Sequence, residues 1–187
     1  MKTQLRLSIA ILLTGLVSLA CAQSSPTIPS GPPAPPPAAT PDQFSNDDFE
    51  IVLGPSWKRQ ANEDSFEWED QDNMQELLVS VLGAKQPMDA KSRLSTANRM
   101  MDIRQKSIRE TSVGELTLTK VERIETDDSV ELVVRGFDKG EGVQIYNAVI
   151  VRTNRAVTLS YYKYPPSLSD DAFRARSNEI RSALKVH

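Results

Sequence analysis

The sequence predicts an α+β fold. We expect one domain over residues 47–187, an α/β/α sandwich with a mostly antiparallel sheet of about seven strands and two covering helices. Two observations predict it. Short segments of alternating apolar and polar residues, separated by Gly, Pro, Asn and Asp, are typical of strands joined by hairpins. Two longer segments have apolar residues at helical spacing, and such helices can cover the two faces of a sheet.

Three strands are expected before the first helix. They cover residues 49–53, 65–69 and 76–82. A Gly-Pro-Ser turn ends the first strand, and the polar run Asp70–Asn73 separates the other two. Turn residues of these types favour reversals of the chain.

The central helix is predicted after Pro87, with Asp89 as its N-cap. Its apolar stripe consists of Ala90, Leu94, Ala97, Met101 and Ile108.

Four more strands are expected, over residues 115–124, 130–137, 143–151 and 156–164. The alternation in the first of them breaks near Lys120-Val121, which predicts a bulge or a change of register. The third is apolar on both faces, which is typical of a central strand covered on both sides.

A final helix closes the predicted domain. Ser169 can cap it, and the acidic pair Asp170-Asp171 suits its positive end. Its apolar stripe is expected to contain Phe173, Ile180 and Leu184.

The first 22 residues have the order of an export signal. Lys2 and Arg6 precede an uncharged apolar run, Leu7–Leu19, and small residues follow. Two cleavages remain open. Cleavage after Ala22 would release a free secreted or periplasmic protein. The segment before Cys21 is similar to a bacterial lipobox. Cleavage before Cys21 would leave a protein lipidated on that residue and anchored in a membrane, which can be the outer membrane.

A Pro-rich segment, residues 23–46, follows the signal. Proline removes backbone donors and fixes φ, so we expect a disordered tether rather than helix or strand. No second apolar run approaches the roughly 18–20 residues that span a bilayer. Membrane contact is therefore expected only through a lipid on Cys21.

Composition excludes several function classes. A net charge of −3 and a sequence pI near 5.3 disfavour nucleic-acid binding. One Cys and one His cannot supply an internal disulfide or a polyhistidine metal site. We find no recognisable catalytic set, and therefore expect no enzyme and no cofactor, although paired carboxylates of a hydrolase stay open.

An acidic stretch is the first candidate binding site. It either forms a surface for a basic partner or is a solvated hairpin. The candidate partner-binding residues are Glu63, Asp64, Glu67, Glu69, Asp70 and Asp72. Asp70-Gln71-Asp72 begins like a calcium loop, but Gln75 and Val81 stand where such a loop needs Gly and Glu. We therefore expect no metal site.

A basic helix face is the second candidate. It either binds anionic lipid headgroups or an acidic protein, or is simply a solvated helix surface. Its residues are Lys91, Arg99, Lys106, Arg109, Arg174, Arg181 and Lys185. Aromatic residues either line a ligand pocket or pack in the core: Trp57, Trp68, Tyr146, Tyr161, Tyr162 and Tyr164.

The layout resembles the PsbP-like family. The resemblance is carried by the opening segment 49–57 (FEIVLGPSW), the strands 148–152 and 156–161, and the closing helix with Asp171-Ala172-Phe173. It implies an α/β/α sandwich without shared catalytic residues. The exported start is most similar to the DcrB-like bacterial lipoproteins of that family.

Together these features predict an exported, non-enzymatic binding or assembly module of the bacterial cell envelope, with an envelope protein as partner. A carrier that holds a small molecule or lipid between helix and sheet is the alternative. A carboxylate-dependent hydrolase is the third reading.

Overall fold

The computed structural model describes residues 41–60 and 65–187. The predicted export signal, the lipidation candidate Cys21 and most of the predicted tether lie outside the described residues. So do Glu63 and Asp64 of the acidic stretch.

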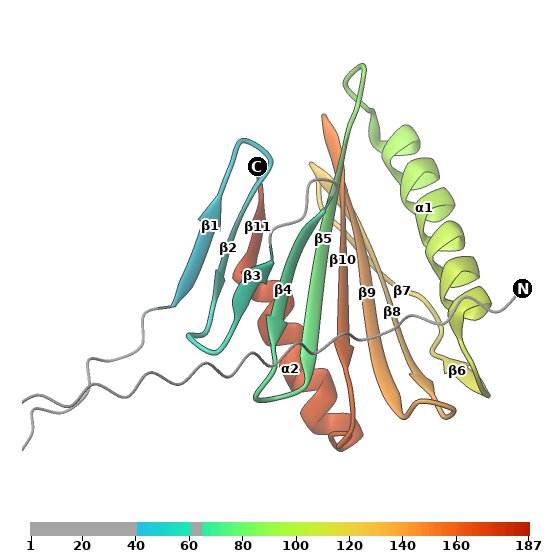
Figure 1. Ribbon diagram of the computed structural model, residues 1–187. Coiled ribbons are helices and arrows are strands. Elements are labelled where there is room, and N and C mark those ends of the chain that lie inside the picture. The colour runs from blue at the N-terminus through green and yellow to red at the C-terminus, as the bar shows by residue number, and fades with distance from the viewer. Residues whose placement is uncertain (1–40, 61–64) are drawn as a thin grey trace, which may run out of the picture. The chain divides into compact units, whose positions relative to one another are not determined.

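An eight-stranded antiparallel sheet forms the centre of the domain (Figure 1). Its strand order is β3-β4-β5-β10-β9-β8-β6, and β7 also pairs with β8. The bounds are β3 Lys58–Gln60, β4 Phe66–Asp70, β5 Gln75–Gly83, β6 Leu116–Leu118, β7 Glu122–Glu125, β8 Ser129–Asp138, β9 Val143–Arg152 and β10 Arg155–Lys163.

Helices lie on both sides of this sheet. Helix α1 (Ala90–Thr111) packs on one side, mainly on β8 and β9. Helix α2 (Asp170–Ala183) packs on the other side, together with a three-stranded sheet in the order β1-β2-β11. These strands cover Asp42–Ser45, Phe49–Leu53 and Leu184–Val186. The α+β sandwich predicted from the sequence is confirmed.

Alternation along the central strands creates two cores. In β9, Ala148 and Ile150 face α2, whereas Val149 and Val151 face α1. Because both sets are buried, β9 is a strand covered on both sides, as predicted. The two predicted N-caps are also confirmed: Asp89 accepts from the Ser92 amide at 2.7 Å and Ser169 from the Ala172 amide at 3.3 Å.

The predicted strand 115–124 is two strands, β6 and β7, rather than one with a bulge. The amide of Thr119 still donates to the Arg135 carbonyl at 2.8 Å, but Lys120 and Val121 then leave the ladder. Val121 packs against the cluster under α1. The gain from placing this apolar side chain explains the interruption.

Both ends of the domain differ from the prediction. Leu184 and Lys185 belong to β11 and not to the last helix, because Leu184 and Val186 alternate into the core as β11 pairs with β2. Residues 42–45 of the predicted tether form β1, where Phe44 packs against the core. The short strand β3 was not predicted either; two of its three residues are exposed and give no apolar signal.

Candidate functional site

The face of the large sheet that carries α1 is only partly covered. Ala97 and Met101 of α1 pack over β8 and β9, and Figure 1 shows the helix over that end of the sheet. Within the described residues, no helix lies over β3, β4 and β5 on this side. A sheet face without cover is a candidate interaction surface.

Three glutamates gather on this uncovered face, which we call the acidic face: Glu67, Glu69 and Glu76. Glu67 stands opposite Leu78, and Glu69 stands opposite Glu76 in the β4–β5 register. Glu69 accepts hydrogen bonds from Gln60 at 3.1 Å and from Gln71 at 3.2 Å. Carboxylates placed directly opposite each other on a sheet repel.

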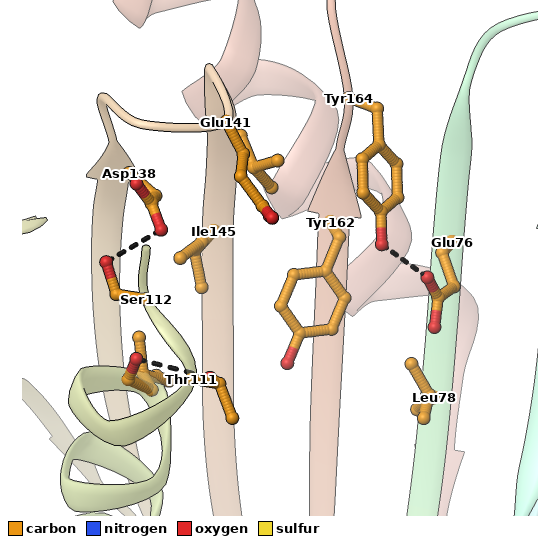
Figure 2. A pocket seen from close by; sticks show the side chains of 11 residues that line it. Glu76, Leu78, Thr111, Ser112, Asp138, Glu141, Ile145, Tyr162 and Tyr164 are labelled. Atoms are coloured by element: carbon orange, nitrogen blue, oxygen red, sulfur yellow. Dashed lines mark hydrogen bonds between the residues drawn. The ribbon is translucent and has the colours of Figure 1, made fainter. Parts of the chain in front are cut away.

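A groove continues the acidic face toward the end of α1. It has a volume of about 280 Å³, and we call it the tyrosine groove. Figure 2 shows Tyr162 on its floor between Ile145 and Leu78. The full lining is Glu76, Leu78, Ile108, Thr111, Ser112, Asp138, Glu141, Val143, Ile145, Tyr162 and Tyr164.

Two phenols and a carboxylate form one side of the groove. The Tyr164 hydroxyl donates to Glu76 Oε2 at 2.7 Å (Figure 2). Burial, followed by this hydrogen bond to Glu76, raises the pKa of Tyr164 well above its usual value. Burial also raises the pKa of Tyr162, although Arg104 nearby opposes the rise. Both rings are therefore neutral at physiological pH, and the negative charge on this side belongs to Glu76.

Asp138 forms the opposite wall and has a structural task. Its carboxylate accepts from Ser112 Oγ at 2.7 Å, from the Val113 amide at 3.2 Å and from the Gly140 amide at 2.8 Å. The Ser112 hydrogen bond is the main cause that lowers the pKa of Asp138. The side chain thus ties the end of α1 to the β8–β9 hairpin and stays ionised at neutral pH.

Glycines allow this tie. A Cβ on Gly114 would lie 2.6 Å from the Cα of Gly140, closer than real side chains approach a backbone. The two loops therefore touch through their backbones, and the groove wall is fixed.

The sequence placed Asp70 in the acidic surface, and this is wrong. Asp70 is fully buried, on the face of β4 opposite to Glu69. It accepts from Ser56 Oγ at 2.8 Å and from Asn73 Nδ2 at 2.8 Å, and so closes the β4–β5 turn. Asp72 is exposed in that turn, outside the acidic face.

The predicted basic helix face does not exist as one surface, because α1 and α2 lie on opposite sides of the sheet. Four of its residues are exposed on α1: Lys91, Arg99, Lys106 and Arg109. Arg174 is exposed on α2, and Lys185 lies on β11, 3.4 Å from Glu50. Arg181 is only partly exposed, and its guanidinium is engaged with Glu131 through two hydrogen bonds of 2.7 Å.

Sequence reasoning found only part of the groove. Tyr162 and Tyr164 had been considered as pocket residues, whereas Trp68, Tyr146 and Tyr161 are buried in the core. Ser112, Asp138 and Glu141 were missed because they come from two loops that only the fold brings together. Their one signal is the Gly-rich hairpin sequence after Asp138.

The described residues contain no group of three His, Cys, Asp or Glu side chains placed to hold a metal ion. In the same part of the chain, no helix is long and apolar enough to cross a membrane.

The fold has a counterpart among solved structures. The solution structure of cyanobacterial PsbP (CyanoP) from Synechocystis sp. PCC 6803 matches with a TM-score of 0.60 at 13% sequence identity. The match covers 85% of this chain and 99% of CyanoP. This chain has a PsbP-like fold. The resemblance drawn from the sequence is therefore confirmed at the level of the fold.

Two further matches to solved structures are weaker. The Ran-binding protein Mog1p from Saccharomyces cerevisiae has a TM-score of 0.43 at 11% identity, over 79% of this chain and 96% of that one. A crystal structure from Bacteroides thetaiotaomicron has a TM-score of 0.37 at 14% identity. This match covers 74% of this chain and 45% of the other. Searches against protein-family models and curated proteins return no match.

Proposed function

We propose that this chain is a non-enzymatic binding module that docks a positively charged segment of another cell-envelope protein. The docking surface is the acidic face together with the tyrosine groove. The observation that carries the proposal is the Glu69–Glu76 pair, two like charges set opposite each other on an uncovered sheet face. Such a pair opposes folding, and a bound cation would relieve it.

The groove next to this pair suits the same kind of partner. Glu76 and Glu141 offer carboxylates, and Tyr162 and Tyr164 offer ring faces. Aromatic faces and carboxylates together attract Lys and Arg side chains. The partner's positive charge therefore matches both halves of the surface.

The position in the cell is part of the proposal. The export signal and the Pro-rich segment support a protein that works outside the cytoplasm, and Cys21 would supply a lipid anchor. These features, with the PsbP-like fold, support a relationship to the DcrB-like lipoproteins. The tether would let the domain search for its partner near a membrane.

The two other functions find less support in this groove. Asp138, with its lowered pKa and its three hydrogen bonds, is engaged in structure and is unsuited to donate a proton. The groove is also open and lined by carboxylates, whereas a lipid carrier needs an apolar cavity.

Crosslinking in the native host tests the proposal. A photoreactive amino acid replaces Lys58, which is exposed and stands opposite Glu69 in the β3–β4 register. The full chain should then give a discrete protein adduct that Glu69→Gln with Glu76→Gln abolishes. The control carries the same group at Val52, an exposed residue of the small sheet, and should give no such adduct.

Two outcomes would overturn the proposal. One is an adduct pattern from position 58 that matches the pattern from position 52. The other is a position-58 adduct that persists in the double glutamine variant, because the acids would then have no part in docking.

A further inference from the structure

A second cavity lies on the side of the sheet opposite to the tyrosine groove. It has a volume of about 280 Å³ and lies between the first turns of α2, the edge strand β6 and its neighbour β8. Its lining is Thr117, Leu118, Thr119, Arg135, Gly136, Phe137, Gln144, Asp170, Phe173 and Arg174. We call it the arginine cavity.

The arginine cavity combines apolar surface with two cations. Phe137 comes from the sheet and Phe173 from α2, while Arg135 and Arg174 enter from the same two elements. Asp170 is the only carboxylate among the lining residues. Apolar walls with a few convergent polar groups are typical of sites for small molecules.

Arg135 has unused hydrogen-bonding capacity. The residue is 9% exposed, and its guanidinium donates to Glu122 at 2.8 Å and to Asn178 at 3.0 Å. Its buried Nε has no partner in the described part of the chain. A buried donor without an acceptor is costly, and the two hydrogen bonds to Glu122 and Asn178 hold the guanidinium in place at the cavity.

Arg174 supplies a charge that the protein leaves free. Arg176 and Arg181, on the same helix, pair with Glu179 and Glu131. Arg174 has no ion-pair partner among the described residues, although it lines the cavity beside Phe173. The positive end of α2 adds no free charge to the cavity, because the carboxylates of Asp170 and Asp171 in its first turn already satisfy it.

The wall of the cavity is held in place before any ligand arrives. The Gln144 side chain donates to the Leu168 carbonyl at 2.9 Å and accepts from the Leu168 amide at 2.8 Å. This pair fixes the loop that leads into α2. Phe173 is also stacked on Tyr161, with ring centroids 5.6 Å apart.

We propose that the arginine cavity binds a small carboxylate that carries an apolar group, such as an aromatic ring. The ring lies against the apolar lining, and the carboxylate meets the guanidinium of Arg174, with Arg135 as a second, Glu122-paired arginine in the wall. This site is independent of the proposed docking surface, because it lies on the other side of the sheet.

Ligand-detected NMR with the full chain tests this proposal. Benzoate has both the ring and the charge, benzyl alcohol has only the ring, and acetate has only the charge. Benzoate should bind more tightly than either of the others. Arg174→Gln should weaken benzoate binding about tenfold, because it removes a charge-assisted hydrogen bond, and should leave benzyl alcohol unchanged.

Arg99→Gln is the matched control, since Arg99 is exposed on α1 on the other side of the sheet. It should leave benzoate binding unchanged. Equal binding of benzyl alcohol and benzoate would overturn the proposal, because the arginines would then be irrelevant. Equal binding of acetate, or equal losses in both variants, would also overturn it by showing only general attraction to positive charge.

Discussion

Glu69 and Glu76 stand directly opposite each other across β4 and β5, on the side of the sheet that carries α1. Like charges in this position destabilise a sheet by a few tenths of a kcal/mol to about 1 kcal/mol. Their neighbours only partly offset this, since Lys58 lies across from Glu69 and the Tyr164 hydroxyl donates to Glu76. The arrangement is therefore better suited to binding than to stability.

Glu76→Gln should stabilise the domain by about 0.5 kcal/mol, because it removes the repulsion. The glutamine oxygen can still accept the hydrogen bond from Tyr164. Urea unfolding of the full chain measures the change. Glu179→Gln is the matched control: it breaks an ion pair with Arg176 and should cost about 0.3 kcal/mol. A Glu76→Gln variant that is no more stable than the unsubstituted protein would contradict the argument.

Phe44 makes β1 part of the domain. Its ring centroid lies 5.4 Å from that of Phe49, 5.1 Å from that of Phe66 and 6.0 Å from that of Trp68. Phe44→Ala should therefore destabilise the full chain by about 2 kcal/mol, less than a fully buried Phe because the ring is half-buried. Urea unfolding followed by tryptophan fluorescence measures it.

Gln43→Ala is the control for Phe44→Ala. Gln43 is the neighbouring residue of β1, and its side chain is exposed. Its loss should change the free energy of unfolding by less than about 0.5 kcal/mol. If both variants behaved alike, the aromatic cluster would not anchor β1.

Local patterns predicted most of the fold. The caps Asp89 and Ser169 and the two-sided burial of β9 follow from short-range chemistry that the sequence displays directly. The strands β1, β3 and β11 were not predicted because they are short. Pairing with distant segments, as β11 pairs with β2, decides their structure.

The candidate site was harder to predict for the same reason. The acidic run placed Asp70 at the surface, yet Asp70 is buried and hydrogen-bonded to Ser56. Arg181, expected on a basic face, is partly exposed and paired with Glu131. Period-2 alternation does separate Glu69 from Asp70, and it could have shown that the acidic stretch divides between two faces. Nothing local indicates that Asp138 meets Ser112, because 26 positions separate them in sequence.

Arg181 should be important for stability rather than for binding. It forms a two-pronged pair with Glu131 that joins α2 to β8, and the side chains are 26% and 11% exposed. Arg181→Met should cost about 2 kcal/mol, because it leaves the largely buried Glu131 carboxylate without its partner. Urea unfolding measures this cost.

A double-mutant cycle separates this pair from simple packing. Adding Glu131→Met to Arg181→Met should restore part of the lost stability, since no unpaired charge remains. Additive losses in the double variant would show that the two side chains act independently.

The four tyrosines should make the domain sensitive to alkali. Burial is the main cause that raises the pKa of every one of them, to about 12 for Tyr161 and also upward for Tyr146, Tyr162 and Tyr164. In the unfolded chain these phenols ionise near pH 10. Unfolding therefore releases protons above that pH. The free energy of unfolding should keep its full value below pH 10 and fall as the pH rises toward 12.

A pH titration that follows tyrosinate absorbance and tryptophan fluorescence together tests this. The absorbance should show no step near pH 10 while the protein is folded. The step should instead coincide with the change in tryptophan fluorescence that reports unfolding. A tyrosinate step at pH 10 in the folded state would show that these rings are open to solvent, and with it the floor of the tyrosine groove.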